Sequence, residues 1–417
     1  MSESPQARPR HARGGLGARI AWIAFLVLVA VLGFVLVYGS TVVDQVDAAL
    51  GANSQDVGSL VGDTRPVRAG EDTQEPTDAD AGNALNILLM GSDVREGDSA
   101  IDGADVEGMR NDTTILLHIS ADRSRVEAVS IPRDAQVEIP ECTYLDGSTI
   151  AGGTGDFNIA FSNGGAHGNA AEAAACTIKT VEQLSDVYID HYVVIDFAGF
   201  VDMVDALGGV PMCITEHIVS EKAHIDLEPG AQVLDGETAL GYARLRTAEE
   251  GDVSGSDLQR ITRQQQLLEQ MATTVLSKNI LTDVGELTRF ARASAESVTM
   301  DPALASTSYL VGLAYSLRGL DPADVGFYTV PWAYTADYLN VEIQPEAEQM
   351  WDDIRNDRAI SVDAEGDQSS EWDDGKKDST EDSTDQDGSG SEPAATSGSG
   401  DDSADETTTE DLLDVCR

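Results

Sequence analysis

The chain has 417 residues and a formal net charge of −48 at pH 7, from 74 acidic and 26 basic residues. Affinity for nucleic acid depends on cations that face phosphates, so a protein this negative is not expected to bind nucleic acid. The excess of acid is explained most simply by solubility.

The N-terminal 38 residues have the pattern of a membrane anchor. Residues 1–19 contain four arginines and a single acidic residue, and Ile20 to Tyr38 contain no charge. Such a stretch is long enough to span a bilayer as a helix, and no small-residue cleavage site follows it. Because basic residues stay in the cytoplasm, we expect a single-pass cell-membrane protein with a cytoplasmic N-terminus and an extracytoplasmic domain.

Composition divides the remaining chain into three parts. Residues 39–83 are small and polar, which predicts an extracytoplasmic linker. Residues 84–356 are long enough for one large domain with a substantial core. Residues 357–417 are predicted to be a disordered acidic tail, because 359–417 contains 19 acidic residues, three basic ones and few apolar ones.

The elements expected within 84–356 mix strands and helices without strict alternation. Strands are expected at 83–93, twice within 113–134 around a turn at 121–124, at 188–196 and at 325–331. Helices are expected at 170–183, 196–209, 235–244, 256–278, 283–296 and 302–318. This order predicts a mixed α/β fold, with a central mixed β-sheet flanked by helices on both faces and preceded by one transmembrane helix.

The four cysteines fit an extracytoplasmic domain. Their spacing contains no C-x-x-C pair, so a zinc site is not expected, and either one or two disulfides are compatible with that compartment. We expect Cys142 to pair with Cys176. Cys213 is then interpreted as a buried apolar residue and Cys416 as a free thiol.

Positive charge gathers at the start of the helix expected at 256–278. Arg260, Arg263 and Gln264 share one face of its first two turns. Cations there oppose the helix dipole, and a bound anion would reverse the sign of that interaction. The alternative is that Asp252 and Asp257 form salt bridges with these arginines. Seven arginines in all are expected in turns or at element ends: Arg95, Arg110, Arg133, Arg244, Arg246, Arg260 and Arg263.

Two carboxylates accompany these arginines. Asp93 follows a buried strand in "GSDVR", and Asp112 precedes another strand in "MRNDTT". One or two carboxylates together with phosphate oxygens are the usual ligands of Mg²⁺ in proteins. The pattern therefore indicates a divalent metal, Mg²⁺ or Mn²⁺, beside a phosphate.

Seven ordered blocks of the sequence resemble those of the LytR–CpsA–Psr family, whose domain is also called the cell envelope-related transcriptional attenuator domain. The blocks are "NILLMGSDVR", "MRNDTTILLHI", "VEAVSIPRD", "FNIAFSNGG", "YVVIDFAGFVDMVDALGGV", "LDGETALGYARLR" and "GSDLQRITRQQQLL". They span about 85–270 and are most similar to actinobacterial members.

The resemblance implies a membrane-anchored phosphotransferase. Such an enzyme moves a glycopolymer from a polyprenyl-pyrophosphate carrier onto peptidoglycan, and the carrier and the acceptor are thus the expected partners. Asp93 and Asp112 would hold the metal, and either could act as the base. The residues that would bind the pyrophosphate are Arg95, Arg110, Arg133, Arg246, Arg260 and Arg263, with Arg244 and Gln264 as further candidates. The catalytic group would comprise Asp93, Asp112, Arg133, Arg260 and Arg263.

Several alternatives stay open at this level. A polyprenyl-pyrophosphate hydrolase would use the same residues with water as the acceptor. A non-enzymatic envelope regulator is a second alternative, although 19 cytoplasmic residues are too few for a helix-turn-helix. A polyprenyl chain would need an apolar slot, for which the runs at 159–178 and 309–320 are candidates, and ordinary helix packing explains them better. The sequence does not identify the glycopolymer.

Overall fold

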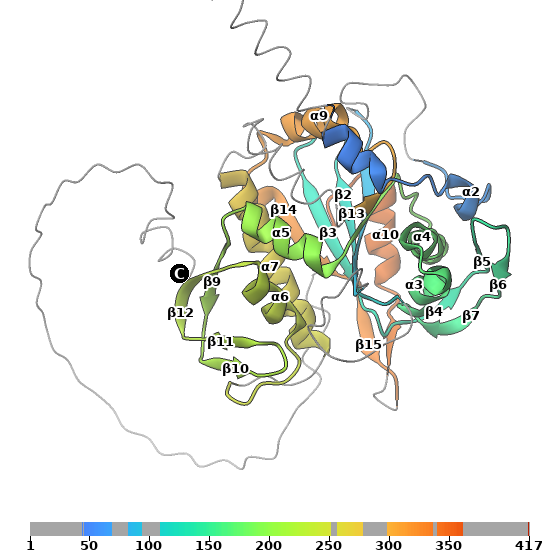
Figure 1. Cartoon of the computed structure of the whole chain (residues 1–417). Coiled ribbons are helices and arrows are strands. Elements are labelled where there is room, and N and C mark those ends of the chain that lie inside the picture. Colours follow the sequence, from blue (N-terminus) through green and yellow to red (C-terminus); the bar gives the residue numbers. More distant parts are fainter. Residues whose placement is uncertain are drawn as a thin grey trace, which may run out of the picture.

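A six-stranded mixed sheet forms the centre of the fold, in the order β13-β8-β1-β2-β3-β14 (Figure 1). The strands are β13 (Val298–Met300), β8 (His191–Ile195), β1 (Leu85–Ser92), β2 (Asn111–Ile119), β3 (Val126–Ile131) and β14 (Val325–Thr329). β1 is antiparallel to β2 and parallel to β8, while β3 is antiparallel to β2 and parallel to β14. The C-terminal ends of β8, β1, β3 and β14 therefore meet the start of β2 at one edge.

This architecture comes from a computed structural model that describes residues 44, 46–68, 82–93, 109–251, 257–277, 298–336, 340–361 and 416. Within these residues, none of the helices combines the length and the apolar character that crossing a membrane requires. The anchor expected at 20–38 and the helix expected at 283–296 lie outside the described residues.

One face of the sheet is covered by α3 (Ile159–Gly164), the 3-10 turn η1 (Gly165–His167), α4 (Ala170–Ser185) and α10 (Ala347–Arg355) (Figure 1). The Asn169 side chain caps α4 by accepting hydrogen bonds from the backbone N–H groups of Ala171 and Glu172. Small residues let α3 and α4 approach closely, since a Cβ on Gly164 would collide with the backbone of α4. This face therefore packs tightly.

The other face carries two groups of elements. The first group is α9 (Thr307–Leu317) together with the helical turns at 46–52. Side chains from both segments pack on one end of the sheet. The second contains α5 (Phe197–Ala206), α6 (Gly236–Arg244) and α7 (Asp257–Ser277). It also includes the ribbons β9 (Val210–Ile214) with β12 (Gly230–Leu234), and β10 (Ile218–Ser220) with β11 (Ile225–Leu227). This second group has its own hydrophobic core.

Smaller elements surround the sheet. They are α2 (Gly58–Val61), η2 (Pro322–Asp324) and the hairpins β4 (Gln136–Ile139) with β7 (Gly153–Asp156), β5 (Cys142–Thr143) with β6 (Thr149–Ile150), and β15 (Trp332–Tyr334) with β16 (Val341–Ile343). The β15–β16 hairpin joins the sheet region where Val341 bridges Ala135.

The predicted mixed sheet with helices on both faces is confirmed. The two strands expected around the turn at 121–124 are β2 and β3, and the helix expected at 256–278 is α7. Gly208 and Gly209 end α5, both with positive φ angles (79° and 89°) that favour glycine.

The linker expected at 39–83 packs on the domain over its described residues 46–68. The apolar side chains of Val46, Leu50 and Leu60 are buried against the domain. Arg65 then forms a salt bridge with Glu182 at 2.6 Å and donates to the Ile189 carbonyl oxygen. Residues 46–68 therefore belong to the folded body.

The start of the expected acidic tail is also ordered. The Asp357 carboxylate accepts hydrogen bonds from the Ala121 backbone N–H at 3.0 Å and from Arg125, and its other close neighbour is the buried His118 ring. Ile360 is buried, and its backbone N–H donates to the Glu127 carboxylate at 2.8 Å. The folded body therefore continues through Ser361.

Both disulfides connect segments far apart in the sequence. The expected Cys142–Cys176 pair is confirmed, with its Cα atoms 5.2 Å apart. The interpretation of Cys213 as a buried apolar residue and Cys416 as a free thiol is wrong, because these two form the second disulfide with Cα atoms 5.1 Å apart. A separation of 203 residues leaves no local signal of such a pairing.

Candidate functional site

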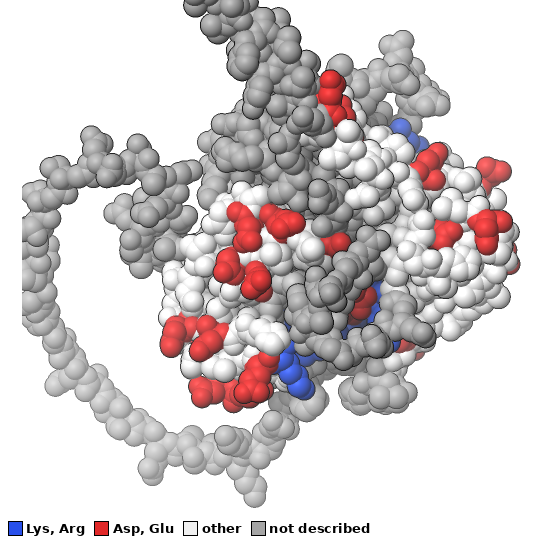
Figure 2. All heavy atoms as spheres, in the orientation of Figure 1, with Lys and Arg blue, Asp and Glu red and all other residues white. Residues whose placement is uncertain are grey.

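The predicted carboxylates meet at the edge of the sheet where its parallel strands end. Asp93 directly follows β1, Asp112 lies at the start of β2, and Arg133 follows β3. Because β1, β2 and β3 are neighbours in the sheet, residues distant in sequence come side by side here. Figure 2 shows that the visible Lys and Arg side chains gather mainly at one place low in the view, among Asp and Glu.

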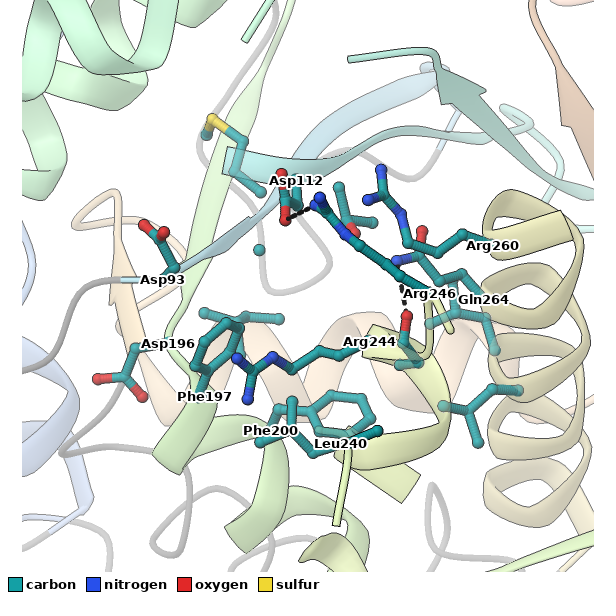
Figure 3. A pocket seen from close by; sticks show the side chains of 18 of the residues that line it. Asp93, Asp112, Asp196, Phe197, Phe200, Leu240, Arg244, Arg246, Arg260 and Gln264 are labelled. Carbon is teal, nitrogen blue, oxygen red and sulfur yellow. Dashed lines mark hydrogen bonds and ion pairs between the residues drawn. The ribbon is translucent and has the colours of Figure 1, made fainter. Parts of the chain in front are cut away.

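Asp112 is the centre of a network of arginines. Its Oδ1 accepts from Arg133 Nη1 at 2.7 Å, and its Oδ2 accepts from Arg246 Nη2 at 3.1 Å (Figure 3). Burial alone would raise the pKa of Asp112, but the charges of Arg133, Arg260 and Arg246 outweigh it and hold the pKa below its ordinary value. Asp112 is therefore ionised and orients its partners.

Asp93 shares the edge in a different electrostatic state. Burial raises its pKa, and the nearby charge of Asp112 raises it further, although the Arg110 backbone N–H donates to Asp93 Oδ1 at 2.7 Å and partly compensates. A buried carboxylate beside another carboxylate is stabilised by an added cation. This electrostatic cost is the observation that fits a divalent metal.

The residues present fit Mg²⁺ only in partnership with a ligand. Within the described ranges, no group of three or more His, Cys, Asp or Glu side chains is arranged to hold a metal ion. Asp93 and Asp112 would supply two carboxylates, and phosphate oxygens would complete the coordination, as is usual for Mg²⁺.

The first turns of α7 support the site from one side. Arg260 is only 3% exposed and lines a cavity together with Gln264. The Gln264 amide donates to the Ala243 carbonyl oxygen at 3.2 Å. Arg263 is also buried, which lowers its pKa, and it donates to the Leu245 carbonyl oxygen. α7 thus holds the segment that presents Arg244 and Arg246.

The cavity has a volume of about 350 Å³ and extends from the charged edge beneath α5, α6 and α7 (Figure 3). Its apolar wall comes from the sheet and the helices: Leu89, Ile115, Ile195, Phe197, Phe200 and Leu240. Arg244 lies 4.6 Å above the Phe197 ring, a cation–π contact where the apolar wall meets the charged mouth. The site therefore combines an arginine-rich rim with an apolar slot.

The structure brings most of the predicted residues together. Asp93, Asp112, Arg244, Arg246, Arg260 and Gln264 line the cavity, and Arg133 contacts it through Asp112. Arg110 contributes its backbone, while its side chain is exposed. Arg263 lies behind the cavity wall, against Leu245. Arg95 lies outside the described residues.

The apolar slot differs from the candidates considered in the sequence. The lining residues come from the sheet, α5, α6, α7 and the β10–β11 region, and none comes from 159–178 or 309–320. Within 159–178, α4 buries its small residues in the core instead. Ordinary helix packing, the preferred explanation of these two runs, agrees with this placement.

Sequence reasoning did not select several of the lining residues, among them Asp196, Phe197, Phe200 and Lys222. Asp196 follows β8 as Asp93 follows β1, so the rule that selected Asp93 would also have found it. The two phenylalanines lie on a helix whose pattern resembles any core helix, and Lys222 lies in an exposed turn. Only the fold connects these three with the site.

Comparison with known proteins identifies the family. The model of the LytR_cpsA_psr family matches residues 58–356. The chain belongs to this family. It is 33% identical over 270 residues to the probable cell wall biosynthesis protein LcpB of Corynebacterium glutamicum. The aligned region covers 63% of this chain and 58% of LcpB.

A second LytR_cpsA_psr relative comes from Halalkalibacterium halodurans. It is the polyisoprenyl-teichoic acid–peptidoglycan teichoic acid transferase TagU, 34% identical over 221 residues, with 51% of this chain and 62% of TagU covered. The chain thus spans less than two thirds of the length of both relatives. Among solved structures, protein gbs0355 of Streptococcus agalactiae has a TM-score of 0.51 and 20% identity, covering 67% of this chain and 89% of that one. The last likeness shows the fold alone.

Proposed function

We propose that this protein is a membrane-anchored, extracytoplasmic phosphotransferase that moves a glycopolymer from a polyprenyl-pyrophosphate carrier onto peptidoglycan. One observation carries the proposal: a cavity with an apolar wall opens at a rim that contains Asp93, Asp112, Arg246 and Arg260. A lipid pyrophosphate has the matching chemistry, an apolar chain that continues from a double anion.

The two ends of the cavity suit the two ends of this substrate. The pyrophosphate would lie at the rim, where the arginine charges converge near the start of α7. The first isoprene units would lie against Ile195, Phe197 and Phe200. Burial of apolar surface favours the lipid in this slot by roughly 25 cal/mol per Å². The substrate would therefore be held in one direction.

The transfer step follows from this orientation. A hydroxyl oxygen of the peptidoglycan acceptor would bond to the sugar-side phosphorus while the bond from this phosphorus to the bridging oxygen breaks. Polyprenyl phosphate would leave with the electron pair of that bond. The hydroxyl proton would pass to a carboxylate of the site, directly or through water. Arg133, Arg246 and Arg260 would neutralise the charge on the phosphate oxygens, which is the principal requirement of phosphoryl transfer.

Asp93 and Asp112 have complementary roles in this proposal. Asp112 is ion-paired and would orient Arg133 and Arg246. Asp93, whose pKa is raised, is the stronger base of the two in the metal-free protein. These two carboxylates would hold Mg²⁺, which would add positive charge next to the phosphate oxygens when bound.

The location of the protein is part of the proposal. The uncharged stretch 20–38 would anchor the chain in the membrane, with the basic N-terminus in the cytoplasm. The segment 46–68, which packs on the domain, would connect this anchor to the folded body. The names of the relatives LcpB and TagU, which refer to cell wall biosynthesis and teichoic acid transfer to peptidoglycan, support the same process.

The test uses the full chain in detergent with a short polyprenyl-pyrophosphoryl glycan, with and without Mg²⁺ and uncrosslinked peptidoglycan. Mass spectrometry would follow polyprenyl phosphate and the glycan–phosphate–peptidoglycan product for the wild type and Arg260→Ala. The control is Arg318→Ala, which removes an exposed arginine of the α9 end. Metal-dependent transfer that is lost only in Arg260→Ala supports the proposal. Release with water as the only acceptor would instead identify a hydrolase, and no reaction or binding would refute both.

A further inference from the structure

The direction from which the acceptor enters follows from the direction in which the lipid leaves. This inference rests on the proposed function. In phosphoryl transfer the attacking and leaving oxygens lie roughly in line, on opposite sides of the phosphorus. The cavity that would hold the leaving lipid is lined by α5, α6 and α7 and by β8, β1 and β2, and none of its lining residues comes from the described strands β3 and β14. The acceptor hydroxyl must then approach from the β3 and β14 side.

The β15–β16 hairpin occupies that side of the edge. β14 pairs with β3. Directly after β14, the Val330 backbone N–H donates to the Ser130 carbonyl oxygen at 3.0 Å, so the chain stays beside β3 for one more residue. The Val341 backbone N–H then donates to the carbonyl oxygen of Asp134, the neighbour of Arg133, at 3.2 Å. Tyr334 lies directly opposite Val341 in the hairpin, two strand spacings or about 10 Å from Asp134.

Two aromatic rings on this hairpin share one face. Trp332 and Tyr334 are separated by one residue in a strand, and their ring centroids are 5.2 Å apart in an edge-to-face arrangement. Trp332 is partly buried against the main core, whereas Tyr334 is 41% exposed. A ring held by the core thus supports a ring that is partly exposed, so the aromatic pair is positioned before anything binds.

Hydrogen-bonding groups surround the aromatic pair. Thr335 donates from its hydroxyl to the Asn340 carbonyl oxygen at 3.0 Å, and the Asn340 side-chain amide donates to Asp156 at 3.0 Å. Sugars bind to such mixed surfaces, because a pyranose ring presents C–H groups on its face and hydroxyls at its rim. A lipid chain would instead require a continuous apolar groove, as the cavity on the other side provides.

We infer that the β15–β16 hairpin is a binding subsite for the sugar chain of the peptidoglycan acceptor, with Tyr334 as the exposed stacking platform and Trp332 as its support. The position, aromatic character and hydrogen-bonding surroundings of the hairpin agree with the side from which an in-line hydroxyl must arrive. The subsite determines acceptor binding and has no part in holding the lipid pyrophosphate.

The test compares Tyr334→Ala with Tyr334→Phe, which keeps the ring, and with Tyr315→Ala, which removes a tyrosine that is 61% exposed on α9. The full chain in detergent would be titrated with soluble peptidoglycan tetrasaccharide by calorimetry, and transfer would be measured against acceptor concentration. We expect Tyr334→Ala to raise the acceptor Kd and KM by about 5- to 10-fold, the range of one lost aromatic contact. Tyr334→Phe and Tyr315→Ala should match the wild type.

Two further measurements separate the possible failures. Binding of the lipid-pyrophosphoryl glycan should be unchanged in Tyr334→Ala, and a urea titration should show that the variant is folded. Equal tetrasaccharide binding by the wild type and folded Tyr334→Ala would overturn the subsite even if transfer occurs. Loss of lipid binding together with acceptor binding would also overturn it, because the hairpin would then act on the whole site. If the wild type binds no lipid pyrophosphate at all, the proposed function itself fails.

Discussion

The two faces of the central sheet contain similar apolar residues but differ in their surroundings: one face is buried in the core, and the other lines a cavity. On one face Leu88, Leu116 and Val129 are completely buried under α3, α4 and α10. On the other face their sequence neighbours Leu89 and Ile115 line the cavity. Alternation along a strand sends successive side chains to opposite faces, so the same strands supply the core and the wall of the cavity. Hydrophobicity alone therefore does not distinguish a structural residue from a binding residue.

The largest effect should come from breaking the packed face. Leu88→Ala removes a side chain that is 0% exposed, and we expect it to lower the free energy of unfolding by about 2–5 kcal/mol. Leu89→Ala, on the cavity face, should cost only about 1–2 kcal/mol because its side chain already faces open space. Urea unfolding with equal m-values would measure both, and equal losses would contradict the distinction between the faces.

The second prediction concerns the charged edge, where activity and stability should separate. Arg246 is 51% exposed and pairs with Asp112, so Arg246→Ala should change the free energy of unfolding by less than about 1 kcal/mol. Transfer should nevertheless fall by roughly 10²- to 10³-fold, because a cation that stabilises the phosphate charge is lost. The assay is initial transfer rate at saturating carrier, beside the Arg318→Ala control. Full activity in a folded Arg246→Ala protein would remove this arginine from the site.

A third prediction sharpens the assignment of the cavity to the lipid. Ala243 lines the cavity, and Ala243→Leu would fill part of it. We expect affinity for a long-chain polyprenyl-pyrophosphoryl glycan to fall by roughly 5- to 150-fold, from a steric cost of about 1–3 kcal/mol. A carrier shortened to a few carbons provides the internal control and should bind equally to both proteins. An equal loss for the short carrier would place the effect at the phosphate rim.

The smallest effects are expected from the two carboxylates at the edge, Asp112 and Asp93. Their replacement by asparagine should change the free energy of unfolding in opposite directions. The pKa of Asp112 is lowered in the folded protein, so Asp112→Asn removes stability at pH 7, and this loss should vanish as pH falls through the lowered pKa. The pKa of Asp93 is raised, so its charged form destabilises the metal-free fold. Asp93→Asn should therefore add stability at pH 7, and the gain should disappear as pH falls from the raised pKa to below 3.8, the ordinary value.

The measurement for this pair is urea unfolding of metal-free protein at several pH values between 3 and 7. Loss of stability in both variants at pH 7 would show that Asp93 is compensated in the folded state. The direction of the two changes, more than their size, tests the electrostatic picture.

Much of the edge was predictable from the sequence, because it depends on local signals. Asp93 and Asp112 lie next to clear strands, and Arg260 lies in the first turn of a strongly patterned helix. Strand ends and helix starts leave backbone groups and side chains at element boundaries, where sites form. The resemblance of the ordered blocks to the family then indicated that these residues belong to one site.

The sequence by itself determined which residues form strands and helices, since alternation, caps and breakers act over a few positions. Only the tertiary structure decided that Cys213 meets Cys416, that residues 46–68 pack on the domain, and that Phe197 and Phe200 line a cavity. These outcomes depend on which surfaces meet in space, and contacts between distant segments leave no mark in the local pattern of either segment. The order of the strands, which no local pattern encodes, finally brought Asp93, Asp112 and Arg133 together at one edge of the sheet.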